Sequence, residues 1–385
     1  MKILIVSTHP THPAIEGNRR YILNQVELFK KMGFDIYFLL LCVNKGEWIG
    51  DRQQIFQQMN KYWGDKLLIY RKGKFFSFFK KLISKIREIC NHGYIKCDDF
   101  YPFGIEKFIE TIDESLKFDA IIVNYYILSR IFSYSKIPLK GIVTHDYFSY
   151  KNILTGVKGA WLCTSADQEA KALQRCPHIF ALNSEEAIFF KKLSPRSTIY
   201  NVYSTYNIKE SNMVGNHKLL FLSGKNNYNL IGLKWFLDKI YPSILNAFPD
   251  CSLDIGGGIC SVLGTSITNK NINLIGFVDN EETFYDRADV VINPTSQGTG
   301  LKIKTFEGLS YGKIVMAHPH SVSGVFEPEN CPVFTSIEPC EWVSFLNSIW
   351  NNTSLILEIK DKDKEYISKM NRYVVGEYKR FFNSI

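Results

Sequence analysis

Short apolar runs alternate with amphipathic stretches along the whole chain. Lys2–Val6 is one apolar run, and a stripe of Ile22, Val26 and Phe29 at helical spacing follows it before Gly33. Continuous apolar strands separated by helices are typical of parallel sheets whose two faces are both covered. Further strands of this first series are expected at residues 35–41, 120–124, 141–145, 179–182 and 198–202.

The pattern starts again after a polar break at Lys209–Asn216. Lys218–Leu222 is expected to be a strand and Leu230–Phe248 a helix with one apolar face. Two successive series of this kind predict two doubly wound α/β domains, with the ligand at the carboxyl ends of the strands, in a cleft between the domains. Further strands are expected at 252–255, 273–275, 290–293 and 314–317, and a charged helix at 360–382.

These elements predict a division of the chain into four parts. The first domain is expected at residues 1–208, a linker at 209–217 and the second domain at 218–359. A C-terminal helix at 360–385 is expected to pack back on the first domain.

Composition and charge narrow the class of protein. The 385 residues are 45% hydrophobic, which suffices for two cores, because single cores stop growing near about 250–300 residues. The formal charge of +8 indicates an anionic partner such as a nucleotide, a phospholipid or a nucleic acid. Nine scattered cysteines with no C-x-x-C pair are expected to be reduced thiols. Because no apolar run suits a signal peptide or a membrane span, a cytoplasmic location is predicted.

The stretch GTGLKIKTFEGLSYGK, at residues 298–313, concentrates glycine and lysine. A helix is expected to begin at Gly300 or Leu301, and at 3.6 residues per turn Gly300, Lys304 and Glu307 share a face. A helix N-terminus suits a phosphate, so Lys304 is expected at a phosphate and Glu307 at the hydroxyls of a ribose. The pattern alone leaves open a plain exposed helix with a Lys304–Glu307 ion pair.

The strings around this stretch resemble the retaining glycosyltransferases of family four, which have the GT-B fold of two Rossmann-like domains. The similarity is strong over residues 218–324 and weaker in the first half, at EGNRR (16–20) and THDYF (144–148). The matching strings stand in the family's order: FLSGKNNYNLIGLKWFLDKIYP at 221–242, LDIGGG at 253–258, INLIGFVDN at 272–280 and ADVVINP at 288–294.

The resemblance implies a donor-binding second domain, an acceptor-binding first domain and roles for individual residues. Glu307 matches the second glutamate of the family's E-x7-E motif, which binds the donor ribose. Lys225 matches a phosphate-binding basic residue, and His145 matches a histidine near the donor sugar. The other positions implied to contact the donor are Gly17, Val278, Gly298, Thr299, Gly300, Leu301, Lys302 and Lys304.

The chain departs from the family's pattern at two places. Thr299 stands eight residues before Glu307, where the family has the first glutamate of its motif, so the donor sugar stays open. The family's second lysine after the first donor strand is replaced by Asn227 and Asn229. Lys302 and Lys304 are expected to supply the missing charge.

Sugar transfer leaves a diphosphate on which negative charge grows. Some transferases stabilise this charge with a metal ion that an Asp-x-Asp motif binds. The only such spacing here, Asp361–Asp363 in KDKDKE, is interpreted as a solvated helix face. Lysines and N–H groups at a helix N-terminus can stabilise the same charge, so no metal is expected, and the family implies no enzyme nucleophile. Lys225, Lys304 and His145 are the catalytic candidates, and a purely structural histidine is the alternative for His145. Arg19 and Arg20 either face phosphate or acceptor or are solvated.

Residues 71–96 carry eight basic side chains and an apolar stripe. A basic amphipathic helix of this kind suits an anionic membrane surface, and a core-packed helix is the alternative. No nucleic-acid-binding module is recognised, so no such partner is expected.

The sequence predicts a nucleotide-sugar-dependent glycosyltransferase that acts with retention. Its acceptor is expected to be a glycan or lipid-linked molecule of a bacterial surface polysaccharide, such as O-antigen or capsule. Two alternatives stay open: a GT-B nucleotide-sugar epimerase or hydrolase, and a non-catalytic membrane-associated module.

Overall fold

The computed structural model describes residues 1–14, 17–42, 51–71, 94–99, 101–155, 164–264, 269–300 and 302–384. Leu301, which was predicted to contact the donor, and most of the basic stretch at 71–96, which was predicted to suit a membrane surface, lie outside the described residues. Both stay predictions. The chain divides into two compact units. The first holds residues 1–205, 299–300 and 374–385, and the second holds residues 206–298 and 302–373.

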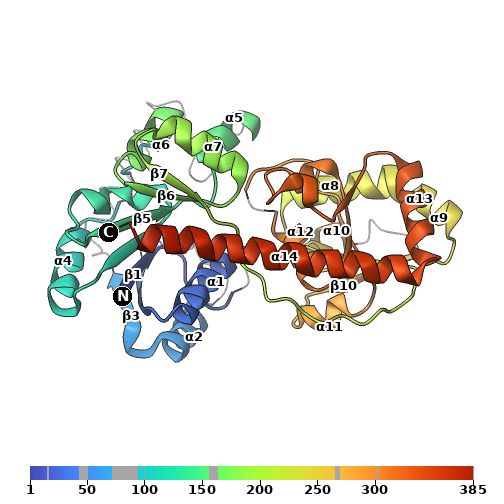
Figure 1. The fold of residues 1–385 in the computed structure, drawn as a ribbon, viewed down its shortest axis with the longest axis horizontal. Coiled ribbons are helices and arrows are strands. Elements are labelled where there is room, and N and C mark those ends of the chain that lie inside the picture. Colours follow the sequence, from blue (N-terminus) through green and yellow to red (C-terminus); the bar gives the residue numbers. More distant parts are fainter. Residues whose placement is uncertain are drawn as a thin grey trace. The chain divides into compact units, whose positions relative to one another are not determined.

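The first unit is built on a seven-stranded sheet in the order β3-β2-β1-β4-β5-β6-β7 (Figure 1). All of its strand pairs are parallel, and the register places Ile3 beside Ile36 on one side and beside Ala120 on the other. The strands are β1 Lys2–Ser7, β2 Asp35–Cys42, β3 Leu67–Arg71, β4 Ala120–Asn124, β5 Leu139–Val143, β6 His178–Ala181 and β7 Thr198–Asn201. The helices are α1 Gly17–Lys31, α2 Arg52–Trp63, η1 Gly64–Lys66, α4 Ile105–Leu116, η2 Tyr126–Ser133, α5 Phe148–Thr155, α6 Ala166–Leu173 and α7 Ser184–Leu193.

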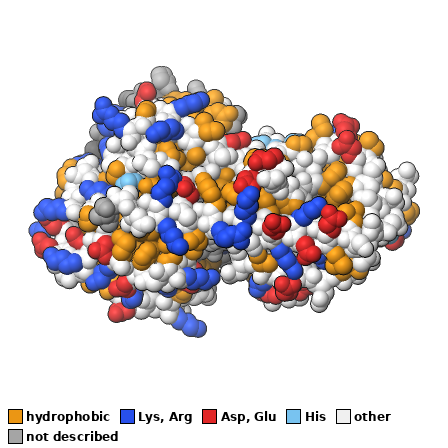
Figure 2. Space-filling model, viewed as in Figure 1, with side chains coloured by type: hydrophobic (Ala, Val, Ile, Leu, Met, Phe, Trp, Pro, Cys, Tyr) orange, Lys and Arg blue, Asp and Glu red, His pale blue; other side chains and the backbone are white. Residues whose placement is uncertain are grey.

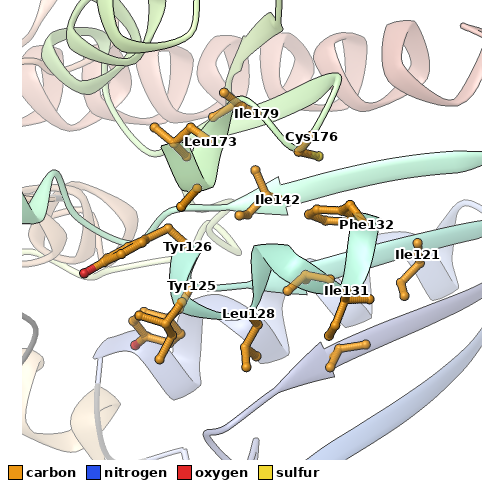
Figure 3. Packing of buried hydrophobic residues seen from close by; sticks show 14 of the residues in the cluster. Ile121, Tyr125, Tyr126, Leu128, Ile131, Phe132, Ile142, Leu173, Cys176 and Ile179 are labelled. Carbon is orange, nitrogen blue, oxygen red and sulfur yellow. The ribbon is translucent and has the colours of Figure 1, made fainter. Parts of the chain in front are cut away.

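One face of this sheet packs on the 3₁₀ helix η2. Leu128, Ile131 and Phe132 of η2 join Ile121 of β4 and Ile142 of β5 in a single buried cluster (Figure 3). Strands β4 and β5 are mostly apolar, as expected for strands that are covered on both faces, with Asn124 and Lys140 as the exceptions.

The second unit is built on a six-stranded parallel sheet in the order β10-β9-β8-β11-β12-β13. The predicted α/β class with two doubly wound sheets is therefore confirmed. Its strands are β8 Lys218–Leu222, β9 Ser252–Gly256, β10 Ile272–Gly276, β11 Val290–Asn293, β12 Ile314–Ala317 and β13 Phe334–Thr335. Its helices are α8 Asn227–Trp235, η3 Phe236–Ile240, α9 Tyr241–Ala247, α10 Cys260–Leu263, α11 Glu281–Tyr285, α12 Ile303–Ser310, η5 Pro319–Val322, η6 Pro328–Asn330, α13 Pro339–Trp350 and α14 Thr353–Phe382.

The helix expected at 230–248 is interrupted in the structure. The run from Asn227 to Ala247 changes to a π-helical turn at η3 and then continues as α9. Pro242 stands in the first turn of α9. Because proline has no N–H to donate, the regular hydrogen-bond ladder cannot pass through this position, which places a local change of winding just before it.

The linker and the last helix differ from their predicted bounds. Residues 202–217 carry no helix or strand, so the irregular segment begins before the expected 209. Helix α14 begins at Thr353, not at 360. Its residues from Val374 onward belong to the first unit, where the Tyr378 hydroxyl lies 3.1 Å from that of Tyr21.

The Asp361–Asp363 pair is only half solvated, which corrects the prediction. Asp361 is exposed, whereas Asp363 is buried, because residues two apart on a helix point to different sides. Both carboxylate oxygens of Asp363 have no hydrogen-bond partner among the described residues. Burial raises the pKa of this carboxyl well above its usual range. The two carboxylates therefore do not form a shared site.

On the face drawn in Figure 2, Lys and Arg side chains lie among Asp and Glu side chains. Among the described helices, none is both long and apolar enough to cross a membrane.

Candidate functional site

Strands β8 and β11 lie at the point where the order of the strands in the second sheet reverses. The chain proceeds from β8 toward β9 on one side, and from β11 toward β12 on the other. In open α/β sheets, ligands bind outside the carboxyl ends of the strands at this switch point. The loops that leave β8 and β11, at residues 223–226 and 294–302, carry Lys225 and the glycine–lysine stretch. The sequence therefore places its candidate residues where the fold favours a ligand.

The loop after β8 is fixed by its neighbours. Ser223 N–H donates to the Gly256 carbonyl at 3.0 Å, and Ile259 N–H donates to the Ser223 carbonyl at 3.2 Å. Gly257 has φ +91°, and a Cβ added there would lie 2.3 Å from the Ser223 oxygen. Only glycine permits this approach. Lys225 follows on this fixed loop and is exposed.

Helix α8 presents one face to the loop after β11. A Cβ added at Gly232 would lie 2.4 Å from the carbonyl oxygen of Pro294, so the helix and the loop touch through this glycine. One turn earlier, a Cβ added at Gly298 would lie 3.3 Å from the Tyr228 ring. The Gly298 backbone has φ +113°, which side chains rarely adopt. The packing against α8 therefore leaves no room for a side chain at Gly232 and little room at Gly298.

His320 of η5 also holds this loop, which the sequence did not indicate. Its Nε2 lies 2.9 Å from the Gly298 carbonyl oxygen and 3.4 Å from the Lys302 ammonium. A carbonyl can only accept, so Nε2 carries the hydrogen and cannot also accept from Lys302. Burial, followed by the charge of Lys302, lowers the pKa of His320, which keeps the ring neutral.

Helix α12 begins at Ile303, later than the predicted Gly300 or Leu301. Gly300 has φ +84°, a left-handed conformation that a right-handed helix excludes. Lys302 precedes the helix with φ −83° and ψ 60°. Gly300 therefore lies in the loop and does not share the helical face of Lys304 and Glu307, which remain one turn apart.

Lys304 reaches from α12 to α8. Its ammonium donates to the Asn229 side-chain oxygen at 2.7 Å, and the Asn229 amide nitrogen donates to the Gly224 carbonyl at 3.3 Å. Burial lowers the pKa of Lys304 to about 8, with Glu307 opposing this shift and Lys302 adding to it. The alternative of a plain exposed helix is wrong, because most of α12 is buried and the ammonium of the half-buried Lys304 is hydrogen-bonded to Asn229.

Val278 lies in the loop after β10. Its side chain packs against the buried cluster of Leu220 and Phe284, which fixes the backbone at this position. The neighbouring Phe277 is 76% exposed. An exposed aromatic ring beside a fixed backbone offers a surface on which a planar base can stack.

Gly17 and two arginines stand at the start of α1 in the first unit. Gly17 is the first residue of the helix. An Arg19 guanidinium nitrogen donates to the Pro13 carbonyl at 3.3 Å, and Arg20 Nε donates to the Ala14 carbonyl at 3.0 Å. Arg19 is fully buried, so the alternative of a solvated arginine is wrong for this residue.

His145 lies just beyond β5, which ends at Val143 and not at the predicted residue 145. Its φ of +67° cannot continue a strand. Its Nε2 lies 2.8 Å from the Asn124 side-chain oxygen, and its ring stacks on Tyr125 at 4.3 Å. Burial, followed by the charge of His9, lowers the pKa of His145 to about 3. His145 is therefore a neutral hydrogen-bonding group at neutral pH.

A hollow of about 330 Å³ lies at the opposite edge of the second sheet. His217 and Asp250 line it, and His217 Nδ1 lies 2.9 Å from an Asp250 carboxylate oxygen. This edge holds the amino ends of β8 and β9, where α/β sheets rarely bind ligands. The hollow is therefore not the site that the candidate residues predict.

The part of the chain that carries the loops after β8 and β11 matches a known protein family. Residues 216–349 match the model of the glycosyl transferases group 1 family. The second unit is therefore similar to glycosyl transferases of group 1 over these residues. The predicted resemblance to these enzymes is confirmed, while family four and the retaining outcome stay predictions.

Two curated relatives of this chain come from bacteria. An uncharacterized 44.6 kDa protein in the cps region of Klebsiella pneumoniae is 27% identical over 349 residues, which are 80% of each chain. An uncharacterized glycosyltransferase of Haemophilus influenzae is 21% identical over 360 residues, which are 90% of each chain. Together with the family match, the second relative supports glycosyltransferase activity.

A mutant of S. aureus TarM, solved with fondaparinux, alpha-GlcNAc-glycerol and UDP, has a similar structure. It matches this glycosyltransferase with a TM-score of 0.65 and 11% identity, over 100% of both chains. At this identity the likeness concerns the fold, and it confirms the predicted GT-B architecture.

The packing of α8 on the loop after β11 predicts that Gly232→Ala destabilises the second unit. Alanine favours a helix over glycine by about 1 kcal/mol, but the added methyl meets the Pro294 carbonyl, and such overpacking costs roughly 1–3 kcal/mol. Gly376→Ala is the matched control, since Gly376 lies in helix α14 with nothing within 4 Å of an added Cβ. Urea denaturation should show a loss of stability for Gly232→Ala and a gain for Gly376→Ala. A gain for both would contradict the packing.

Proposed function

We propose that this protein transfers a sugar from a nucleotide-diphosphate sugar to a glycan or lipid-linked acceptor, with retention of configuration. The observation that carries the proposal is the contact of Lys304 with Asn229 and of Asn229 with Gly224. It joins α12 to α8 and to the loop after β8, and it holds a half-buried positive charge near the switch point of the sheet. Such a place suits the diphosphate of a nucleotide.

The donor is proposed to lie along the carboxyl ends of the second sheet. Lys225, Lys302 and Lys304 bind the diphosphate, and Glu307, one turn into α12, accepts hydrogen bonds from the ribose hydroxyls. The backbone at Val278 and the exposed ring of Phe277 take the base. UDP is the first nucleotide to test, because the similar TarM mutant was solved with UDP.

The reaction breaks the bond between the anomeric carbon and the diphosphate and forms one to an acceptor hydroxyl. Negative charge then grows on the departing diphosphate. Fixed cations in a partly dry site stabilise such charge without reorganisation. The proposal therefore assigns this role to the lysines and requires no metal and no enzyme nucleophile. His145, held neutral by burial, is a hydrogen-bonding group for the sugar and not a cationic acid.

A role in surface polysaccharide synthesis is supported by the Klebsiella relative, which is described as lying in the cps region. The acceptor is accordingly proposed to be a glycan or a lipid-linked glycan. Contact with the inner face of a membrane, through residues 71–96, remains part of the proposal.

The first test is a thermal-shift screen of UDP-, GDP-, ADP- and CMP-sugars, followed by turnover assays with the best donor, with and without EDTA. Lys225→Ala and Lys304→Ala should each lower kcat by roughly 10²–10³-fold, the loss typical of one charge-stabilising donor. Glu307→Ala should mainly weaken donor binding. Lys234→Ala is the control, because Lys234 is exposed on α8 and should retain normal kinetics.

Several outcomes of that screen would overturn the proposal. Stabilisation by no nucleotide sugar would favour a non-catalytic module, and donor turnover without any acceptor would favour an epimerase or hydrolase. Complete loss of activity in EDTA would contradict the metal-free mechanism. Normal rates for both lysine variants would remove their assigned roles.

The lowered pKa of Lys304 predicts a pH dependence of the donor kcat/KM. The diphosphate binds the charged form of the lysine, so kcat/KM should fall as pH rises through about 8. In Lys304→Arg this alkaline fall should disappear, because a guanidinium stays protonated there. An identical fall in both proteins would show that another group titrates.

A further inference from the structure

Asn229 uses both ends of its side-chain amide. Its oxygen accepts from the Lys304 ammonium at 2.7 Å, and its nitrogen donates to the Gly224 carbonyl at 3.3 Å. The orientation of the amide follows from chemistry, because an ammonium only donates and a carbonyl only accepts. Asn229 is 9% exposed, so water competes little for either bond.

Asparagine fits this position better than the residues closest to it in size or charge. Aspartate would hold the ammonium but would place a negative oxygen against the Gly224 carbonyl. Leucine would remove both hydrogen bonds and would leave the Lys304 ammonium without this partner, at a cost of about 1–3 kcal/mol, while the Gly224 carbonyl would keep only the Ser223 hydroxyl at 3.2 Å. Lysine would bring a second cation to the Lys304 ammonium. Asparagine satisfies both neighbours and adds no charge where an anion is to bind.

We propose that Asn229 is a positioning residue that makes Lys304, from α12, the second phosphate-binding lysine of the donor site. The inference rests on the proposed function and deepens it. One of the three N–H donors of the ammonium goes to Asn229, and the other two are directed to the diphosphate. The chain thus replaces a lysine on α8 by a pair of residues on α8 and α12.

The charged groups around Lys304 define how the pair responds to pH. Glu307, on the same helix, raises the pKa of Lys304, and Lys302, just before the helix, lowers it. From α8, the neutral Asn229 oxygen favours the charged ammonium through its hydrogen bond. Removing that oxygen lowers the pKa of Lys304 further, so the charged form is lost at a lower pH.

The test exchanges the two side chains in the full-length protein. Kd values for UDP, GDP and ADP are measured by calorimetry for wild type, Asn229→Ala, Asn229→Lys, Lys304→Asn and the double variant Asn229→Lys with Lys304→Asn. For the diphosphate that wild type binds best, each single variant should raise Kd by roughly 10–100-fold, the range for a charge-assisted contact. The double variant restores one lysine and one amide and should recover to within about 5-fold of wild type.

Two further readouts separate positioning from a merely structural role. Asn227→Ala is the control, since Asn227 is exposed at the start of α8 and should keep Kd within about 2-fold of wild type. In Asn229→Ala, the alkaline rise in Kd should begin at a lower pH than in wild type, because the hydrogen bond that favours the ammonium is gone. A structural defect would raise Kd equally at every pH and would not be rescued by the exchange.

The possible failures are distinguishable. If wild type binds a diphosphate and Asn229→Ala binds it equally well, or if the double variant is no better than Lys304→Asn alone, the inference is overturned and the proposed function survives. If wild type binds none of the three diphosphates, the proposed function fails and the inference fails with it.

Discussion

The hydrogen bond from the Lys304 ammonium to the Asn229 amide can form only if three conditions hold together. Strands β8 and β11 must be neighbours, so that α8 and α12 start at the same edge of the sheet. Helix α8 must approach the loop after β11 closely, which Gly232 permits. The loop after β8 must also present the Gly224 carbonyl to the amide, and its contacts with β9 and α10 fix it there. The local chemistry thus depends on the topology of the whole unit.

Two lysines of the second unit, Lys360 and Lys304, have partners of different charge. Lys360 is buried and lies 2.8 Å from Asp289, which also accepts N–H groups of Val214 and Gly215. This pair is matched in charge and ties the segment after residue 206 to α14, so removing either partner would strand a buried charge. Lys304 is different, since its closest partner is a neutral amide. A half-buried cation with a neutral partner has more to gain from an anionic ligand, and this favours Lys304 over Lys360 as the proposed diphosphate-binding residue.

The apolar pattern predicted most strands because parallel strands with covered faces are apolar throughout. β4, β8, β11 and β12 match their predicted ranges, whereas the helix start at 300 was wrong because left-handed glycines delay α12 to Ile303. Strand β13 was missed because it has only two residues, and β3 was missed although its LLIY run is as apolar as the strands that were predicted. The candidate lysines and Glu307 could be read from spacing and family resemblance. The roles of Asn229, Gly232 and His320 could not, because they arise from contacts between segments far apart in the sequence. Only Asn229 had a signal in the sequence, since it stands where the family has its second lysine.

The central claim is that the loops after β8 and β11 form one nucleotide-diphosphate site. Hydrogen–deuterium exchange with and without saturating UDP tests it most directly, because exchange reports each loop separately. The account predicts slower exchange at residues 223–230 and 296–310 in the same sample. Unchanged exchange in both loops, or protection only at residues 215–218 and 250–252 on the opposite edge of the sheet, would contradict it.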